Sequence, residues 1–138
     1  MANTGDFYTV QLKAPHLDWG EIRYTDTRTP IPGEGYIPIP ANDAYRLRLL
    51  NSNGTGGRDV FGENLFYCHS ADGHFQGTLR AQGNQDQTTY AKQFSADGNL
   101  RAIGRWYANI GAVPGDIIRV SWTSPTDILI EKLYIFVL

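Results

Sequence analysis

Residues 111–122, Gly-Ala-Val-Pro-Gly-Asp-Ile-Ile-Arg-Val-Ser-Trp, carry the clearest structural signal in this chain. Pro114 and Gly115 suit the two central positions of a type II turn, because proline fixes φ at about −65° and glycine tolerates the positive φ of the second position. The apolar and β-branched residues that follow, from Ile117 to Trp122, predict a strand. The stretch therefore leads the chain through a tight turn into a sheet.

The segment before this turn predicts a helix over residues 100–110. Its apolar residues recur at helical spacing and form one stripe of Leu100, Ile103, Tyr107 and Ile110. Asn99 suits the N-cap, and Gly111 suits the left-handed position after the last turn. Residues 100–122 are thus expected to form a compact helix, turn and strand unit.

The amino-terminal part contains a strand pattern and a second helix pattern. Residues 7–13 alternate apolar and polar side chains, and Pro15 is expected to end this strand, whose inner face would hold Tyr8, Val10 and Leu12. Prolines within residues 31–40 exclude a helix and allow only an edge strand or an extended segment. A short helix is expected at residues 43–50, with Asn42 as its N-cap and one face formed by Ala44, Leu47 and Leu50.

Residues 63–82 predict a hairpin with Asp72 and Gly73 at its turn, and residues 128–138 predict one or two last strands. The number and order of these elements favour a mainly antiparallel β-barrel or sandwich with two short helices.

Length and composition indicate one globular domain over residues 1–138, which ends on apolar residues as if excised from a longer chain. Cys68 is the only cysteine, and the amino terminus lacks a signal-peptide pattern. No apolar run reaches the length of about 18 residues that spans a bilayer. We therefore expect a cytoplasmic protein without a membrane segment.

Polar side chains crowd the stretch Arg80–Phe94. Arginine and lysine only donate hydrogen bonds, ionised aspartate only accepts them, and asparagine and glutamine do both. These residue types distinguish base edges in a DNA major groove. A hydrophilic surface loop would explain the same composition. A second cluster of such residues comprises Arg23, Thr25, Asp26, Thr27 and Arg28.

The net charge of −2 and the pI near 5.8 argue against nucleic-acid binding over the whole surface. Residues 80–105 nevertheless hold four cationic and two acidic side chains, which is +2 by count. A local excess of this kind can serve phosphate contacts.

Catalytic and cofactor patterns are weak. The glycine-rich residues 53–57 lack the Gly-Lys-Ser/Thr end of a nucleotide-binding loop. The sequence contains no Gly-x-Ser-x-Gly motif of a serine hydrolase, and Cys68 lies within an expected strand, which argues against a nucleophilic cysteine. Cys68, His69 and His74 lack metal-ligand spacing. On a strand, Asp127 and Glu131 would point to the same face and Lys132 to the opposite face, so the three side chains would not converge as a nuclease site requires. We expect no catalytic residue, metal or cofactor.

Four pieces of the sequence, in their order, resemble the B3-like DNA-binding domains of prokaryotic restriction endonucleases and plant transcription factors. They are Trp19-Gly20, Tyr36-Ile-Pro-Ile-Pro with a short helix after it, Leu100–Tyr107 followed by Gly111-Ala-Val-Pro-Gly-Asp-Ile-Ile, and Asp127-Ile-Leu-Ile-Glu-Lys-Leu. Together they cover most of the chain, and they are closer to the endonuclease branch. The glycine-rich loop is longer and the charge more acidic than that family usually shows.

The resemblance implies an open seven-stranded pseudobarrel, mainly β, that grips the major groove between two arms. The first arm would be the loop before Tyr36, and the second would lie between a strand ending near Gln82 and the helix starting at Leu100. The implied DNA-binding residues are Arg23, Thr25, Asp26, Thr27, Arg28, Arg80, Gln82, Asn84, Gln85, Asp86, Gln87 and Lys92. The implied function is sequence-specific recognition of double-stranded DNA as the target-recognition or effector domain of a restriction–modification enzyme. A nuclease domain in the same or another chain would then cut the DNA.

A β-sandwich that binds carbohydrate or a protein partner is the alternative from a different class. Exposed aromatic side chains would serve such a module, and the candidates are Trp19, Tyr24, Tyr90, Trp106 and Trp122. Trp106 and Trp122 are expected in the core instead, because they lie in the most regular helix and strand patterns.

Overall fold

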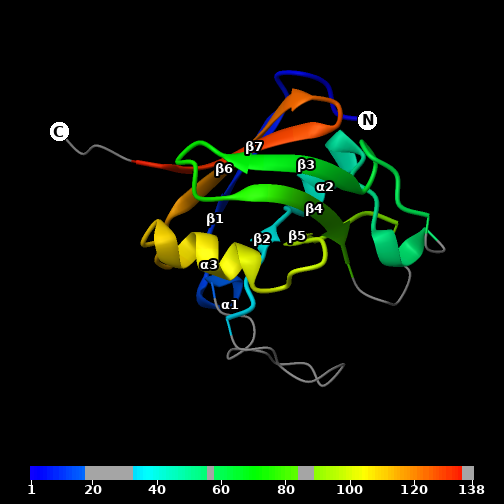
Figure 1. The fold of residues 1–138 in the computed structure, drawn as a ribbon. Coiled ribbons are helices and arrows are strands. Elements are labelled where there is room, and N and C mark those ends of the chain that lie inside the picture. Colours follow the sequence, from blue (N-terminus) through cyan, green and yellow to red (C-terminus); the bar gives the residue numbers. More distant parts are fainter. Residues whose placement is uncertain (18–32, 56–57, 84–88, 135–138) are drawn as a thin grey trace.

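The computed structural model describes residues 1–17, 33–55, 58–83 and 89–134, and these hold seven strands that form one sheet (Figure 1). The order across the sheet is β1-β6-β7-β3-β4-β5-β2, and β3 and β7 are the one parallel pair in this described part. The bounds are β1 Phe7–Gln11, β2 Ile37–Pro38, β3 Leu65–Ser70, β4 Gln76–Gln82, β5 Gln93–Ala96, β6 Ile117–Ser124 and β7 Asp127–Leu133. The sheet curls into a nearly closed barrel with an unsealed seam, which confirms the expected open, mainly β, seven-stranded architecture.

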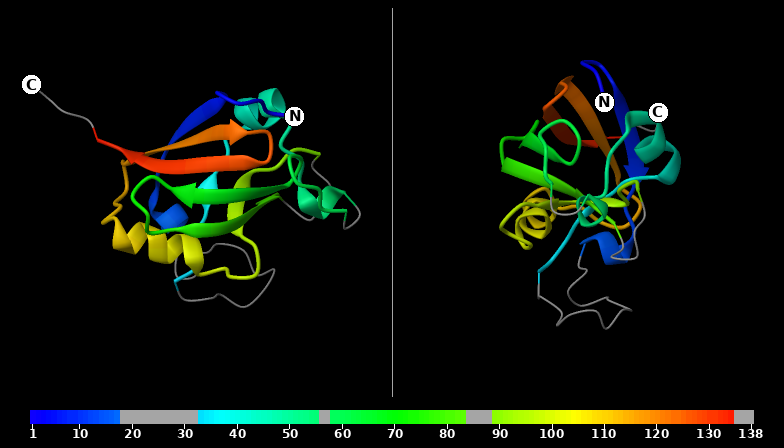
Figure 2. Two further views of the ribbon diagram at one scale, coloured as in Figure 1. Left: turned by 45° about the horizontal axis from the view of Figure 1, so that its top comes forward. Right: turned by 90° about the vertical axis from the view of Figure 1, so that its right-hand side faces the viewer.

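Three short α-helices accompany the barrel: α1 Ala14–Leu17, α2 Ala41–Leu47 and α3 Ala102–Asn109, together with the 3₁₀ turn η1 Ser52–Gly54. The helices α1 and α3 lie on one side of the barrel, and α2 lies toward the other side (Figures 1 and 2). None of the helices in the described ranges is long and apolar enough to cross a membrane. The expected number of two helices is wrong, because Pro15 is accommodated in the first turn of α1, where its missing N–H costs nothing.

A row of contacting aromatic rings lies in the core of the barrel. Phe66 of β3 contacts the ring of Phe94 of β5 edge to face at 5.7 Å, and contacts Trp122 of β6 in the same way at 5.9 Å. Tyr8 of β1 extends this row, with its ring centroid 6.3 Å from that of Trp122. Each edge-to-face pair adds about 0.5–1.5 kcal/mol beyond the burial of its area. Trp106 and Trp122 are both 1% exposed, so the prediction that they belong to the core is confirmed.

Side chains bridge the seam between the edge strands β1 and β2. The Tyr8 hydroxyl donates to the carbonyl oxygen of Pro38 at 3.1 Å. From α2, Arg46 donates to the Phe7 carbonyl at 2.8 Å and pairs with Asp43 at 2.9 Å. A charged side chain on an exposed strand edge is a common protection against edge-to-edge association.

The helix, turn and strand unit forms as the sequence predicts at its carboxyl end. Gly111 follows α3 with φ +64°, and the Ala112 N–H donates to the Tyr107 carbonyl at 2.9 Å. Gly115 has φ +98°, and the Asp116 N–H closes the turn on the Val113 carbonyl at 3.1 Å. The helix itself begins at Ala102, two residues later than expected.

The second helix, α2, is displaced from its expected place. It begins at Ala41, directly after Pro40 with φ −59°, so Asn42 lies inside the first turn and is not the N-cap. It ends at Leu47 because Arg48 adopts the left-handed conformation with φ 53°. Leu50, expected on the helix, forms an isolated bridge with Tyr90.

Glycines allow the chain to enter β2 closely packed on α3. A Cβ atom at Gly35 would come within 2.9 Å of the Gly104 Cα, and one at Gly104 would overlap the Gly33 carbonyl oxygen. The Tyr107 hydroxyl also donates to the Tyr36 carbonyl at 2.8 Å. The segment 33–36 is therefore fixed in place by α3.

Candidate nucleic-acid interface

The predicted DNA-binding residues fall partly outside the described ranges. All members of the first cluster do so, and so do four of the second: Arg23, Thr25, Asp26, Thr27, Arg28, Asn84, Gln85, Asp86 and Gln87. Arg80, Gln82 and Lys92 are described, and they lie on and around the end of β4.

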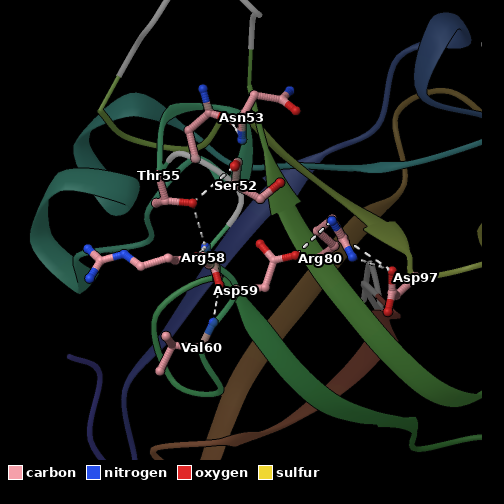
Figure 3. A network of polar contacts seen from close by, with 10 residues as sticks. Ser52, Asn53, Thr55, Arg58, Asp59, Val60, Arg80 and Asp97 are labelled. Atoms are coloured by element: carbon pink, nitrogen blue, oxygen red, sulfur yellow. Dashed lines mark hydrogen bonds and ion pairs between the residues drawn. The ribbon is translucent and has the colours of Figure 1, made fainter.

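Arg80 is held between two carboxylates (Figure 3). One of its terminal nitrogens lies 2.9 Å from Asp59, and the other lies 2.8 Å from Asp97, which also accepts from Nε at 3.1 Å. Asp59 precedes β3 and Asp97 follows β5, so this side chain joins segments on both sides of β4. Its side chain is 31% exposed. Arg80 thus has a structural role in this state, and its contact with DNA stays a prediction.

Asn51 fixes the two chain positions that flank residues 84–88, and this side chain is fully buried. Its Oδ1 accepts from the Gly83 N–H at 2.8 Å and from the Asn53 N–H at 3.0 Å, while its own N–H donates to the Thr89 carbonyl at 3.0 Å. Asn53 adds a bond from Nδ2 to the Gly83 carbonyl at 3.0 Å. Gly83 and Thr89 are therefore anchored to η1.

A second buried asparagine organises the adjacent loop. Asn64 is fully buried, and its Oδ1 accepts from the Val60 N–H at 2.7 Å. Its Nδ2 donates to the Arg58 carbonyl at 3.1 Å, and its own carbonyl accepts from the Ala81 N–H at 2.9 Å. These bonds attach the loop that carries Asp59 to the side of β4.

Two exposed cationic side chains, Arg58 and Lys92, lie near the segments that Asn51 and Asn64 hold in place. Arg58 extends away from Arg80 in Figure 3, and neither it nor Lys92 forms an ion pair with another described residue. The Lys92 N–H donates to the Gln82 carbonyl at 2.7 Å, so its backbone is fixed beside the end of β4. Unpaired cations on a fixed backbone suit phosphate contacts, which position a protein on the duplex.

An aromatic pair lies beside Thr89, whose carbonyl accepts the Asn51 N–H. Tyr45 of α2 contacts the ring of Tyr90 edge to face at 5.4 Å, and Tyr45 is 67% exposed. Lys92 could be predicted from the sequence, but Arg58 and Asn51 could not, because both belong to a stretch whose composition is typical of a flexible loop. An asparagine that bonds backbone groups two and 32 residues away leaves no local signal.

The β2–β5 pair fixes the points at which the two predicted arms join the barrel. Residues before Tyr36 enter β2 at the end where Ile37 pairs with Phe94. At the other end, the Ile39 N–H donates to the Lys92 carbonyl, and Gln82 pairs with Gln93. The segment before Tyr36 and the segment from Gly83 to Lys92 therefore leave opposite ends of one short strand pair.

No family model, curated protein or solved structure matches this chain. The resemblance to B3-like domains accordingly rests on the sequence pieces themselves.

Proposed function

We propose that this protein binds double-stranded DNA in the major groove and distinguishes a short base sequence with the two arms, residues 18–35 and 83–92. The observation that carries the proposal is the separation, along β2, of the points at which the two arms join the barrel. Ile39 lies three positions after Tyr36, which is about 10 Å of extended chain at about 3.3 Å per residue. The major groove of B-DNA is about 12 Å wide, so the spacing of these two points is close to the distance between the two sides of the groove.

The charges at the second arm support the proposal. Arg58 and Lys92 flank the end of β4 and are free to meet phosphates, whereas Arg80 is occupied by Asp59 and Asp97. In this arrangement exposed cations fix the duplex, and the amides and aspartate of residues 84–87 read base edges. Gln82 is half-buried opposite Gln93 and would contribute at the root of the arm.

The domain would serve as the target-recognition or effector part of a restriction enzyme, with cutting performed by a nuclease domain in the same or another chain. The chain by itself should then leave bound duplexes intact in the presence of Mg²⁺. Cleavage by the purified chain would contradict this part of the proposal.

Selection of bound duplexes from a randomised pool tests the recognition directly. We expect a short enriched motif, and we expect binding to that motif to weaken steeply as salt is added, because counterions are released when cations meet phosphates. Absence of binding even at low salt would overturn the proposal. Equal binding of all duplexes would overturn sequence reading.

A further inference from the structure

An open hollow of about 560 Å³ lies along the β3–β4 hairpin beside the start of β7. It is unrelated to the arms, and the nucleic-acid proposal does not use it. Its lining combines the exposed ring of Tyr67 and the buried ring of Phe75 with several hydrogen-bonding side chains, namely His69, Gln76, Thr78 and Asp127. Volumes of roughly 300–1,000 Å³ are usual for small-molecule sites.

The ring of Tyr67 is held as a wall of the hollow. Phe61 stacks on it with ring centroids 4.3 Å apart and an interplanar angle of 14°. Tyr67 lines the hollow and Phe61 does not, so the stack orients a ring at the border of the hollow. Tyr67 is 52% exposed although its orientation is fixed. A rigid aromatic face of this kind binds flat apolar surfaces at a low cost in side-chain entropy.

The strand register places polar residues next to Tyr67. Tyr67 pairs with Thr78 on one side and with Asp127 on the other, and His69 pairs with Gln76. Oδ2 of Asp127 accepts from the hydroxyls of Ser124 at 2.6 Å and Thr126 at 2.7 Å. These bonds fix the carboxylate, and its Oδ1 accepts no hydrogen bond from a described residue.

The chemistry of the lining restricts the ligand. Among the described residues, no lysine or arginine lines the hollow and Asp127 is the one carboxylate there, so phosphates and other anions are disfavoured. The donors and acceptors of Gln76, Thr78 and Asp127 suit a neutral ligand with many hydroxyl groups. We propose that this hollow binds a pyranose sugar, whose apolar ring face stacks on Tyr67 while its hydroxyls bond the neighbouring polar side chains.

A glycan array probed with the intact chain, followed by NMR titration of the best oligosaccharide, tests the site. We expect binding that added salt leaves unchanged, and amide shifts confined to β3, β4 and the start of β7. Tyr67→Ala should weaken binding at least about tenfold, which corresponds to about 1.4 kcal/mol. Tyr67→Phe should retain most of it, because stacking needs only the ring.

Tyr45→Ala is the matched control, since Tyr45 is another exposed tyrosine in an aromatic pair and lies outside the hollow. This variant should bind the oligosaccharide like the wild type. Failure of every glycan on the array to bind would overturn the proposal. Binding that survives Tyr67→Ala would overturn it as well. Neither result bears on DNA binding.

Discussion

The hydroxyl of Tyr8 on β1 donates a hydrogen bond of 3.1 Å to the carbonyl oxygen of Pro38 on β2, and so joins the two edge strands across the seam. The ring of Tyr8 is 3% exposed and lies against Trp122. The barrel is therefore closed here by a side chain rooted in its core. The exposed guanidinium of Arg46, on α2, adds a second contact to β1 at the Phe7 carbonyl.

Tyr8→Phe should lower the free energy of unfolding by about 1 kcal/mol, the usual net value of one hydrogen bond, while the ring keeps its packing. Urea denaturation measures this loss. Tyr45→Phe removes a hydroxyl from a tyrosine that is 67% exposed and should change stability little. Equal effects of the two substitutions would contradict the closure of the seam by Tyr8.

Stability should fall at alkaline pH. Burial raises the pKa of Tyr8 and Tyr107 well above the ordinary value of 10.0, and it raises the pKa of Cys68 above 9.0. These groups stay protonated in the folded state and ionise on unfolding, so their contribution is constant below the unfolded pKa values and is lost as pH rises above them.

Urea denaturation across this range should therefore show the free energy of unfolding declining from about pH 9 and more steeply above pH 10. Cys68→Ala should remove the first part of the decline and leave the second. A free energy of unfolding that does not change with pH across the range would show that these three side chains ionise in the folded state as readily as in the unfolded state.

Gly104→Ala should destabilise the protein although alanine favours helices by about 1 kcal/mol over glycine. The new Cβ would overlap the Gly33 carbonyl oxygen, and overpacking of this kind costs about 1–3 kcal/mol. Asn109→Ala, at an exposed position of α3, should gain only the helix propensity. Thermal melting separates the two, and a raised melting temperature for Gly104→Ala would show that segment 33–36 can move away from α3.

Local sequence signals predicted the hairpin, the turn before β6 and the end of α3, because each depends on residues within a few positions of one another. The sequence did not predict β5. Phe94, Ser95 and Ala96 are all buried, so the alternation that marks a strand is absent there. Those residues also continue the polar stretch that was interpreted as one long arm. Of the described residues between β4 and β5, Gly83 and residues 89–92 lie outside both strands.

The site was harder to predict than the fold, because its contacts join distant segments. Arg80 looked like a free cation in the sequence, but Asp59 and Asp97 converge on it from 21 residues before and 17 residues after. Nothing in the composition of either neighbourhood indicates that convergence. Strand pairing of β4 with its neighbours creates it.

Asn51→Ala should free Gly83, because it removes the acceptor of the Gly83 and Asn53 amides. Losing these bonds in a buried place costs about 1–3 kcal/mol. Amide hydrogen exchange at Gly83 should accelerate by much more than exchange in β6. Asn64→Ala is the matched control, since it removes a buried asparagine that bonds Val60 and Arg58 instead. Comparable acceleration at Gly83 in both variants would mean that Asn51 does not anchor this position specifically.

Arg58→Ala and Lys92→Ala should each weaken DNA binding by a similar factor for preferred and unrelated duplexes, because a phosphate contact carries no sequence information. Each should also reduce the slope of log affinity against log salt by about 1. Arg119→Ala is the control, since Arg119 lies on β6 and is paired with Glu131 at 2.6 Å. If either of the first two substitutions changed the preferred motif and left the salt slope unaltered, that side chain would contact a base edge. If neither changed binding while the wild type bound DNA, the duplex would lie on another face of the barrel.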